Sequence, residues 1–396
     1  MPAQRWPVFD EEQIAAVADV LRSGKVNAWT GPDVNAFEAE YADHLGVAHA
    51  IAFANGSVSL NAALAALDLS PGDEVIVTPR SFVASASCVL LFGATPVFAE
   101  IDRDSGNITP ETIAERITPR TKGIIPVHLG GWPCDMPAIM ALARARGLWV
   151  VEDCAQAHGA MIDGRPVGSF GDFASFSFCQ DKILSTGGEG GLLAVSDEAL
   201  WRRAWSYKDH GKDHATVFAE DHPPGFRWLH AHPGTNLRMP GTCAALGRIQ
   251  LRRLPDWHRD RARNAARLAR AFAPSPLLRT PMPRAGLTHA WYRFYTYVRP
   301  ERLADGWSRD RIVAEINAAG FPAFSGSCSE IYLEKTFDGA NRPAEPLPVA
   351  RELGETSLAF LVDPTWSLAG IDDLIAAAMP ILYAASAETT EAVRAI

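Results

Sequence analysis

The feature that most constrains the fold is a regular alternation of short apolar runs with helix-like stretches between about residues 45 and 200. The apolar runs include HAIAFA, DEVIVTP, TPVFAEI, KGIIPVHL, LWVVEDC, FASFSF and GGLLAVS. Between them lie segments such as SLNAALAALDL and MPAIMALARARG. Strands that alternate with helices are typical of a layered α/β architecture. We therefore predict a large, mainly parallel sheet covered by helices.

The N-terminal region reads as one helix followed by a loop. Residues 10–23 (DEEQIAAVADVLRS) have an acidic first turn and apolar positions at helical spacing, so they predict a helix. Residues 24–32 (GKVNAWTGP) then predict a loop.

The C-terminal half predicts a second unit. Residues 205–240 are polar, show little periodicity and predict a long functional loop, with histidines at His210, His214, His222, His230 and His232. A basic amphipathic helix from about 243 to 273 follows, then the helix RDRIVAEINAAG and a C-terminal helix from 370. We predict a large domain at 1–254, and a linker helix with a smaller α+β domain at 255–396.

Composition excludes several classes of protein. A chain of 396 residues with 47% hydrophobic residues can bury substantial cores, so it is neither disordered nor fibrous. The formal charge of −9 argues against a protein that covers nucleic acid, although a local basic pocket stays open. Six scattered cysteines, no signal-like apolar core and no long apolar stretch predict a cytoplasmic protein without a membrane partner.

A carboxylate and a lysine give the first chemical indication. Asp153 ends an apolar strand, and Lys182 follows 29 residues later beside a glycine-rich turn. Ligands of open α/β sheets bind outside the carboxyl ends of strands. Pyridoxal 5'-phosphate (PLP) needs a buried carboxylate that keeps its pyridine nitrogen protonated and a lysine that holds it as an imine. That lysine must be neutral to attack, so its surroundings have to lower its pKa.

A turn upstream gives the second indication. Residues 54–57 (ANGS) follow a strand and precede a helix, and free N–H groups at a helix start suit a cofactor phosphate. Most such turns bind nothing, a lone Asp153 is more often a helix cap, and a lone Lys182 is more often an exposed cation. The turn, Asp153 and Lys182 occur together and in this order along the chain, which makes a PLP site the better interpretation.

The same segments carry a resemblance to a known family. NGSVSLNAAL, PVHLGG, VEDCAQAHGA, FSFCQDKILSTGGEGG and TNLRM closely resemble the DegT/DnrJ/EryC1/StrS family of PLP-dependent sugar aminotransferases, over roughly residues 10–260. The resemblance implies the type I PLP-dependent fold, which is aspartate aminotransferase-like. It also implies a homodimer with active sites at the subunit interface.

The resemblance assigns roles around the cofactor ring. Lys182 matches the lysine of the Schiff base, Asp153 the partner of the pyridine nitrogen, and Gln156 a residue beside the ring and its hydroxyl. Phe82 matches an aromatic residue stacked on the ring, although packing in the core is the commoner fate of a phenylalanine.

Further positions match the phosphate site. Gly56, Ser57 and Ser177 match phosphate-binding residues, although Ser177 could instead satisfy a buried backbone group. Asn236 matches a residue that reaches the phosphate from the neighbouring subunit, and Arg238 is expected to accompany it.

Other residues are assigned with the structural alternative beside them. Trp29 and Thr30 are candidate substrate-binding residues of the first loop. Glu189 is interpreted as a turn residue and His158 as a buried core histidine, and neither is predicted to be catalytic.

The sequence departs from the family's usual pattern in two places. STGGEGG has two glycines before its glutamate where many relatives have one, and the segment 205–235 is long and rich in histidine. The irregular spacing of these histidines makes a metal site the weaker idea, so we predict no metal and a solvated loop with some substrate contacts.

The predicted reaction is a transamination. L-glutamate would convert PLP to pyridoxamine 5'-phosphate, and a nucleotide-linked keto sugar would take the amine; by resemblance this sugar is a 4-keto-6-deoxyhexose, with a 3-keto sugar as the alternative. Such amino sugars enter polysaccharides, lipopolysaccharides or glycosylated metabolites. Pocket residues of the second domain are expected around 327–332.

Three rival functions are weaker. Members of the dehydratase branch have a histidine where Lys182 stands. A regulator or sensor without turnover stays open, although no helix-turn-helix segment is evident and the acidic charge disfavours DNA. A dinucleotide-binding enzyme would need GxGxxG where the first turn reads NGSVSL.

Overall fold

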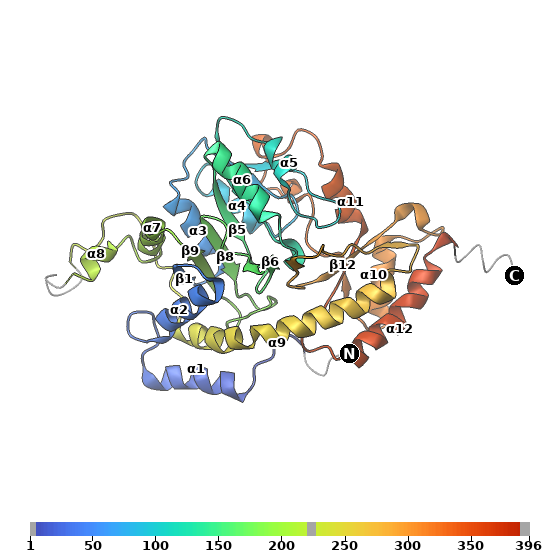
Figure 1. The fold of residues 1–396 in the computed structure, drawn as a ribbon, viewed down its shortest axis with the longest axis horizontal. Coiled ribbons are helices and arrows are strands. Elements are labelled where there is room, and N and C mark those ends of the chain that lie inside the picture. The colour runs from blue at the N-terminus through green and yellow to red at the C-terminus, as the bar shows by residue number, and fades with distance from the viewer. Residues whose placement is uncertain (1–4, 220–226, 389–396) are drawn as a thin grey trace.

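The fold is that of a computed structural model, which describes residues 5–219 and 227–388. A seven-stranded sheet forms the centre of its larger part (Figure 1), in the order β1-β9-β8-β5-β4-β2-β3. The strands are β1 (His49–Phe53), β2 (Glu74–Val77), β3 (Thr95–Phe98), β4 (Thr121–Ile125), β5 (Trp149–Asp153), β8 (Phe173–Ser177) and β9 (Gly191–Val195). Neighbours are parallel except where β9 pairs with β1 and β8. The prediction of a large, mainly parallel sheet is confirmed.

Helices join and cover these strands. In this part of the chain they are α1 (Glu11–Ser23), α2 (Asp33–Leu45), α3 (Gly56–Ala66), α4 (Ala84–Leu90), α5 (Pro110–Ala114), η1 (Leu129–Gly131), α6 (Met136–Arg146), α7 (Glu198–Lys208) and α8 (His214–Val217). The first helix begins where the sequence predicted it, because the side chains of Asp10 and Gln13 form a reciprocal capping box. It ends at Gly24, whose positive φ of 67° suits glycine.

The segment predicted as one loop at 205–240 is partly helical, which corrects the prediction. Helix α7 runs through its first residues to Lys208, and the single turn α8 begins at His214. Asp197 caps α7, and Trp201 and Trp205 pack on the ring of His214, so local apolar contacts extend the helix. His222 lies outside the described residues.

A second part contains a four-stranded antiparallel sheet in the order β10-β12-β14-β13. Its strands are β10 (Leu278–Arg279), β12 (Phe294–Val298), β13 (Ala323–Phe324) and β14 (Ser357–Phe360), and its helices are η2 (Pro300–Arg302), α10 (Arg309–Ala318), η3 (Ile331–Leu333), η4 (Gly339–Asn341), α11 (Pro348–Thr356) and α12 (Leu368–Ala384). A small sheet joins β6 (Met161–Ile162) and β7 (Arg165–Pro166) to β11 (Leu287–Thr288).

The long helix α9 (Gly241–Phe272) runs beneath both parts, as Figure 1 shows in yellow. Its C-terminal half packs into a core with α10, α12 and the four-stranded sheet, while a larger core surrounds the seven-stranded sheet. Residues 331–353 also contribute to the larger core. The proposed boundary between 1–254 and 255–396 falls inside α9 and stays a proposal.

Within 5–219 and 227–388, no helix combines the length and apolar character that crossing a membrane would require.

Candidate active site

The strands β1, β5 and β8 bring their carboxyl ends to one edge of the sheet, where the predicted residues meet. A cavity of about 1260 Å³ opens there. Seven predicted site residues line it: Gly56, Ser57, Phe82, Asp153, Gln156, Ser177 and Lys182. Side chains from the second part of the chain form its opposite wall, among them Tyr295 and Phe324. The cavity therefore lies between the two sheets.

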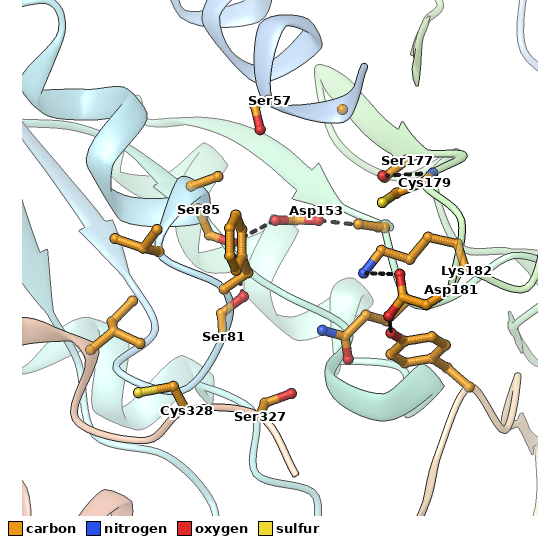
Figure 2. A pocket seen from close by; sticks show the side chains of 18 of the residues that line it. Ser57, Ser81, Ser85, Asp153, Ser177, Cys179, Asp181, Lys182, Ser327 and Cys328 are labelled. Atoms are coloured by element: carbon orange, nitrogen blue, oxygen red, sulfur yellow. Dashed lines mark hydrogen bonds and ion pairs between the residues drawn. The ribbon is translucent and has the colours of Figure 1, made fainter. Parts of the chain in front are cut away.

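The turn after β1 is built for an anion. Asn55 caps α3 by accepting the N–H of Val58 at 3.0 Å. Gly56 leaves no room for a side chain, because a Cβ there would lie 2.8 Å from the Cβ of Ser177. Ser57 is exposed at this helix start and faces the cavity (Figure 2). The positive end of the α3 dipole thus points to a hydroxyl-lined part of the cavity that suits a phosphate.

Asp153 lies at the bottom of the cavity and is 5% exposed. Its Oδ2 accepts the hydroxyl of Ser85 at 2.7 Å, and its Oδ1 accepts the N–H of Ala155 at 3.1 Å. Figure 2 shows the contact between Asp153 and Ser85. These hydrogen bonds fix a buried carboxylate in one orientation, as a partner for a protonated ring nitrogen needs.

Lys182 extends into the cavity from the loop after β8, and its neighbour Asp181 gathers charged and polar groups around it. The Lys182 Nζ lies 3.9 Å from Oδ1 of Asp181 (Figure 2). The hydroxyl of Tyr292 donates to Asp181, and Arg293 lies 3.6 Å from it. Burial alone would raise the pKa of Asp181, but the charge of Lys182, the Tyr292 hydroxyl and Arg293 outweigh it and lower that pKa.

Gln156 and Phe82 present their side chains in different ways. Gln156 is 6% exposed, and its Oε1 accepts the N–H of Gly130 at 2.7 Å, so the turn η1 fixes the amide. Phe82 is 68% exposed although it lines the cavity. Its ring is therefore not part of the core, and a flat ring that stays available at a cavity wall is suited to stacking.

The two residues set aside as structural lie in contrasting places. His158 is fully buried; its Nε2 donates to the carbonyl of Ser177 at 2.9 Å and its Nδ1 accepts the hydroxyl of Tyr41 at 2.7 Å. Burial lowers the pKa of His158 to about 3, so the ring is neutral. Glu189 lines the cavity, a position that its interpretation as a turn residue did not predict.

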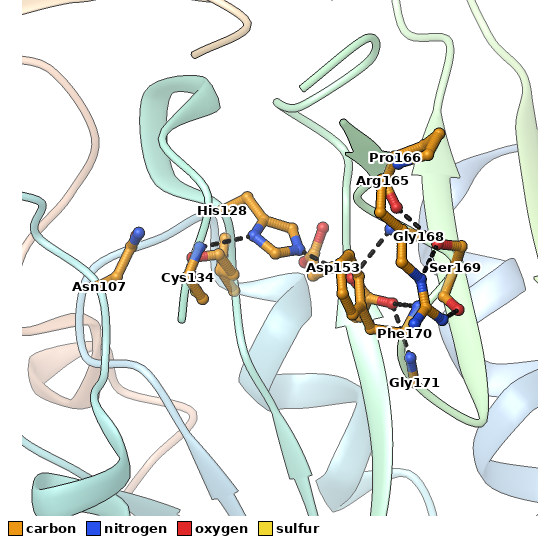
Figure 3. Close-up of polar contacts among 12 residues, drawn as sticks. Asn107, His128, Cys134, Asp153, Arg165, Pro166, Gly168, Ser169, Phe170 and Gly171 are labelled. Atoms are coloured by element: carbon orange, nitrogen blue, oxygen red, sulfur yellow. Dashed lines mark hydrogen bonds and ion pairs between the residues drawn. The ribbon is translucent and has the colours of Figure 1, made fainter. Parts of the chain in front are cut away.

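A buried polar network supports β5 beneath Asp153. Both oxygens of Glu152 are occupied, by the N–H groups of Gly168, Phe170 and Gly171 at 2.7–2.9 Å and by Nε2 of His128 at 3.2 Å. Figure 3 shows these polar contacts. The Nδ1 of His128 accepts the N–H of Cys134, so Nε2 carries the hydrogen.

With the nearby Cys154, His128 and Glu152 have the spacing of metal ligands. Their hydrogen bonds leave neither the carboxylate nor the imidazole a free lone pair for an ion. We therefore assign this cluster the role of holding the end of β5 and the turn at 168–171 in place.

Four predicted residues lie away from the cavity, and three of them gather at Asp209. The indole N–H of Trp29 donates to Asp209 at 3.0 Å, Arg238 donates to it at 2.8 Å, and the backbone of Asn236 pairs with it. Thr30 is exposed and bonds to Asn27. Asn236 was expected to act in the neighbouring subunit, so its role and those of its neighbours stay predictions.

Some residues at the cavity were missed by the sequence reasoning. Ser85 contacts Asp153 and Asp181 contacts Lys182, while Tyr292 and Arg293 contact Asp181. None of the four was assigned a role from the sequence. Asp181 had one available signal, since a charged residue beside the proposed lysine must affect its chemistry. From the segment expected at 327–332, Ser327, Cys328 and Ile331 line the cavity.

Comparison with known proteins identifies the fold and the class of enzyme. A sequence profile described as the DegT/DnrJ/EryC1/StrS aminotransferase family matches residues 7–378. The chain belongs to this family. The predicted resemblance, the type I aminotransferase fold and the assignment as an aminotransferase of sugar biosynthesis are thereby confirmed.

Three of the matching proteins illustrate the similarity. A solved aminotransferase from Psychrobacter cryohalolentis is 52% identical with a TM-score of 0.93, over 95% of this chain and 98% of that one. The UDP-N-acetyl-3-dehydro-alpha-D-glucosamine 3-aminotransferase of Acidithiobacillus ferrooxidans is 37% identical over 84% of each chain. The dTDP-3-amino-3,4,6-trideoxy-alpha-D-glucose transaminase of Streptomyces venezuelae is 34% identical, over 89% of this chain and 87% of that one.

Proposed function

We propose that this family member is a PLP-dependent aminotransferase that moves an amino group from L-glutamate to a nucleotide-linked keto sugar. The observation that carries the proposal is the meeting of three groups in one cavity: the α3 anion turn, the buried Asp153 and the amine of Lys182. Each group alone is common in α/β proteins. Together they match the phosphate, the ring nitrogen and the aldehyde of one cofactor.

The residues present fit PLP. Gly56 has no room for a Cβ, and it begins α3 at the cavity. Asp153 accepts a hydrogen bond from Ser85, and the ring of Phe82 is exposed. Gly56, Ser57 and Ser177 would hold the phosphate. When bound, PLP supplies an electron sink for the carbon that gains or loses the amine.

The protein's own groups would do the acid–base work. The carboxylate of Asp153 would keep a proton on the ring nitrogen, because a buried anion favours the charged form of its partner. The Nζ of Lys182 would attach the cofactor and, once released, accept and return a proton as a neutral amine. Gln156 would orient the ring through the side chain that Gly130 holds.

Two keto sugars are candidate acceptors. The sequence resemblance suggested a nucleoside-diphosphate 4-keto-6-deoxyhexose. The names of the two relatives from A. ferrooxidans and S. venezuelae both place the amino group at carbon 3, which favours a 3-keto sugar as the second candidate. A cavity of about 1260 Å³ has room for a substrate of either kind beside a cofactor.

We also propose a homodimer with shared active sites. In its support, Trp29, Asn236 and Arg238 form a partly exposed group at Asp209 that does not line the cavity of its own chain. Such a group has no use in its own cavity but would be available to a second subunit. The six cysteines are all free, in keeping with the proposed cytoplasmic location.

The test is a product analysis with purified protein, PLP and L-glutamate. A 4-keto-6-deoxyhexose nucleotide and a 3-keto hexose nucleotide would be offered separately, and products separated by mass spectrometry. We expect one of them to give a product in which hydrogen and an amino group replace the ketone oxygen, and the Lys182→Ala variant to give none. No amino product from either sugar would contradict the proposal and favour a sensor without turnover.

A further inference from the structure

A second cavity of about 660 Å³ lies next to the active site and has no role in the function proposed so far. Asp181, Arg293 and Phe324 line both cavities, so the two share a wall. Trp6, Arg261 and Trp366 line the second cavity but not the active-site cavity. Because Asp181 directly precedes Lys182, this side chamber begins beside the reacting amine.

Two residues that line the side chamber, Arg261 and Trp366, each hold a buried hydrogen-bond donor without a partner among the described residues. Arg261 is 1% exposed; its Nη1 donates to the carbonyl of Trp291 at 3.2 Å, but its Nε has no partner among the described residues. The Nε1 of Trp366, which is also 1% exposed, likewise has no partner within that part of the chain. Buried donors left unpaired are costly, and neither group can accept a hydrogen bond. The walls of the side chamber therefore carry unpaired donors and favour an occupant with acceptor oxygens over an apolar one.

The charge of the side chamber favours an anion. Arg5, Arg261 and Arg293 line it, against the carboxylates of Asp181 and Asp363. Burial lowers the pKa of Arg261 to about 10, so it is still a cation at neutral pH. The carboxylate of Asp363 opposes this lowering of the pKa of Arg261, and the charge of Arg293 adds to it to a smaller extent. With three arginines against two carboxylates, the side chamber keeps one positive charge in excess, which an added carboxylate would neutralise while accepting guanidinium N–H groups.

The side chamber is within reach of the reacting amine. Asp181 lies between Lys182 and Arg293, with its Oδ1 3.9 Å from Nζ of Lys182 and its Oδ2 3.6 Å from Nη2 of Arg293. Figure 2 shows Lys182 and Asp181 side by side at the cavity wall. A small amino acid whose nitrogen takes the place of that of Lys182 can therefore extend its side chain past Asp181 to Arg293.

We propose that the side chamber binds the side-chain carboxylate of a dicarboxylic amino donor, between Arg293 and Arg261. This inference rests on the proposed function and adds a donor subsite to it. The keto sugar would occupy the larger cavity, so the two substrates would use different walls around one reacting centre. Arg293 at the shared wall is then a specificity-determining residue for the donor.

The first test compares two donors of equal size and different charge. L-glutamate and L-glutamine would be mixed with the PLP-loaded enzyme, and loss of the visible cofactor band would give a rate and an apparent Kd for each. We expect the wild type to favour glutamate. In Arg293→Gln the preference should fall at least about tenfold, as expected when a charged hydrogen bond is lost, while the reaction with glutamine should change little. Arg267→Gln, which removes an exposed ion pair with Asp372, should behave as wild type.

A second test needs no turnover. Glutarate carries both carboxylates but no amino group, and its binding to cofactor-free protein would be measured by calorimetry for wild type, Arg293→Gln and Arg267→Gln. We expect binding that only Arg293→Gln weakens. Two results would overturn the proposed donor subsite. One is that Arg293→Gln weakens the reactions with glutamate and glutamine equally, and the other is that glutarate binds equally to all three proteins. If neither donor changes the cofactor spectrum, the proposed function itself fails.

Discussion

The indole N–H of Trp6 donates a hydrogen bond of 2.7 Å to the backbone carbonyl of Lys182, although 176 residues separate them in the chain. The Trp6 ring also packs edge-on against Trp257 of α9, with 4.9 Å between ring centroids. The N-terminal segment therefore ties the loop that carries Lys182 to the helix that joins the two parts of the chain.

The variant Trp6→Phe tests this tie. Phenylalanine keeps an aromatic ring against Trp257 but cannot donate to the Lys182 carbonyl. We expect a loss of about 1 kcal/mol in unfolding free energy, the usual net value of one hydrogen bond. We also expect kcat to fall while the cofactor stays bound. Urea titration and steady-state kinetics measure the two effects, and unchanged values for both would show that the bond holds nothing in place.

Ser85 is expected to act through Asp153. Its hydroxyl donates to Asp153 at 2.7 Å and also contacts Ser81 at 2.9 Å. In Ser85→Ala the carboxylate loses one fixed orientation but keeps its charge, so kcat should fall less than in Asp153→Asn. For Asp153→Asn we expect a loss of at least about a hundredfold, which is typical when a preorganised electrostatic partner is removed. A larger effect of Ser85→Ala than of Asp153→Asn would contradict this order.

The turn after β1, which is proposed to bind the phosphate, depends on the absence of a side chain at Gly56. A Cβ there would lie 2.8 Å from the Cβ of Ser177 and 3.3 Å from the carbonyl oxygen of Phe176, so α3 and β8 would have to separate. Overpacking of this kind costs about 1–3 kcal/mol, and we expect the apparent Kd for PLP to rise about fivefold or more in Gly56→Ala. Fluorescence titration with PLP measures it. Asn61→Ala, later in the same helix, should leave the Kd unchanged.

His158 should make stability depend on pH. Burial lowers its folded pKa from 6.5 to about 3, so between these pH values the imidazole is protonated in the unfolded chain but neutral in the folded protein. The stability that His158 contributes is complete above pH 6.5 and is lost as the pH falls toward 3, with a slope of up to about 1.4 kcal/mol per pH unit. Urea unfolding at pH 7, 6 and 5 should show a smaller slope for His158→Gln than for wild type, whereas the exposed His232→Gln should match wild type.

The parts of the site that could be predicted from sequence are those in which chemistry is local. Asp153 and Ser177 each end a strand, and Gly56 begins a helix, so the topology of a parallel sheet brings them to one edge without further information. Lys182 comes five residues after Ser177, so it lies near the same edge. The place of each residue at the end of its strand or the start of its helix therefore also predicts where it lies in the fold.

The contacts that were missed connect segments far apart in the chain. Tyr292 and Arg293 reach Asp181 from the second part, and Trp6 reaches Lys182 from the N-terminus. Single-sequence patterns report periodicity along one element, not which elements pack together. The end of α7 was missed for a related reason, because the packing of Trp205 against His214 and Phe218 extends the helix into a polar segment.

That Lys182 holds the cofactor is tested most directly by absorption spectra of the purified protein with PLP, before and after L-glutamate. Wild type should show a visible band of lysine-bound cofactor that glutamate converts to a near-ultraviolet band. Lys182→Ala should lack the visible band. Lys335→Ala, which removes another amine that lines the same cavity, should keep it. A visible band that persists in Lys182→Ala, or its absence from wild type, would contradict the assignment of Lys182.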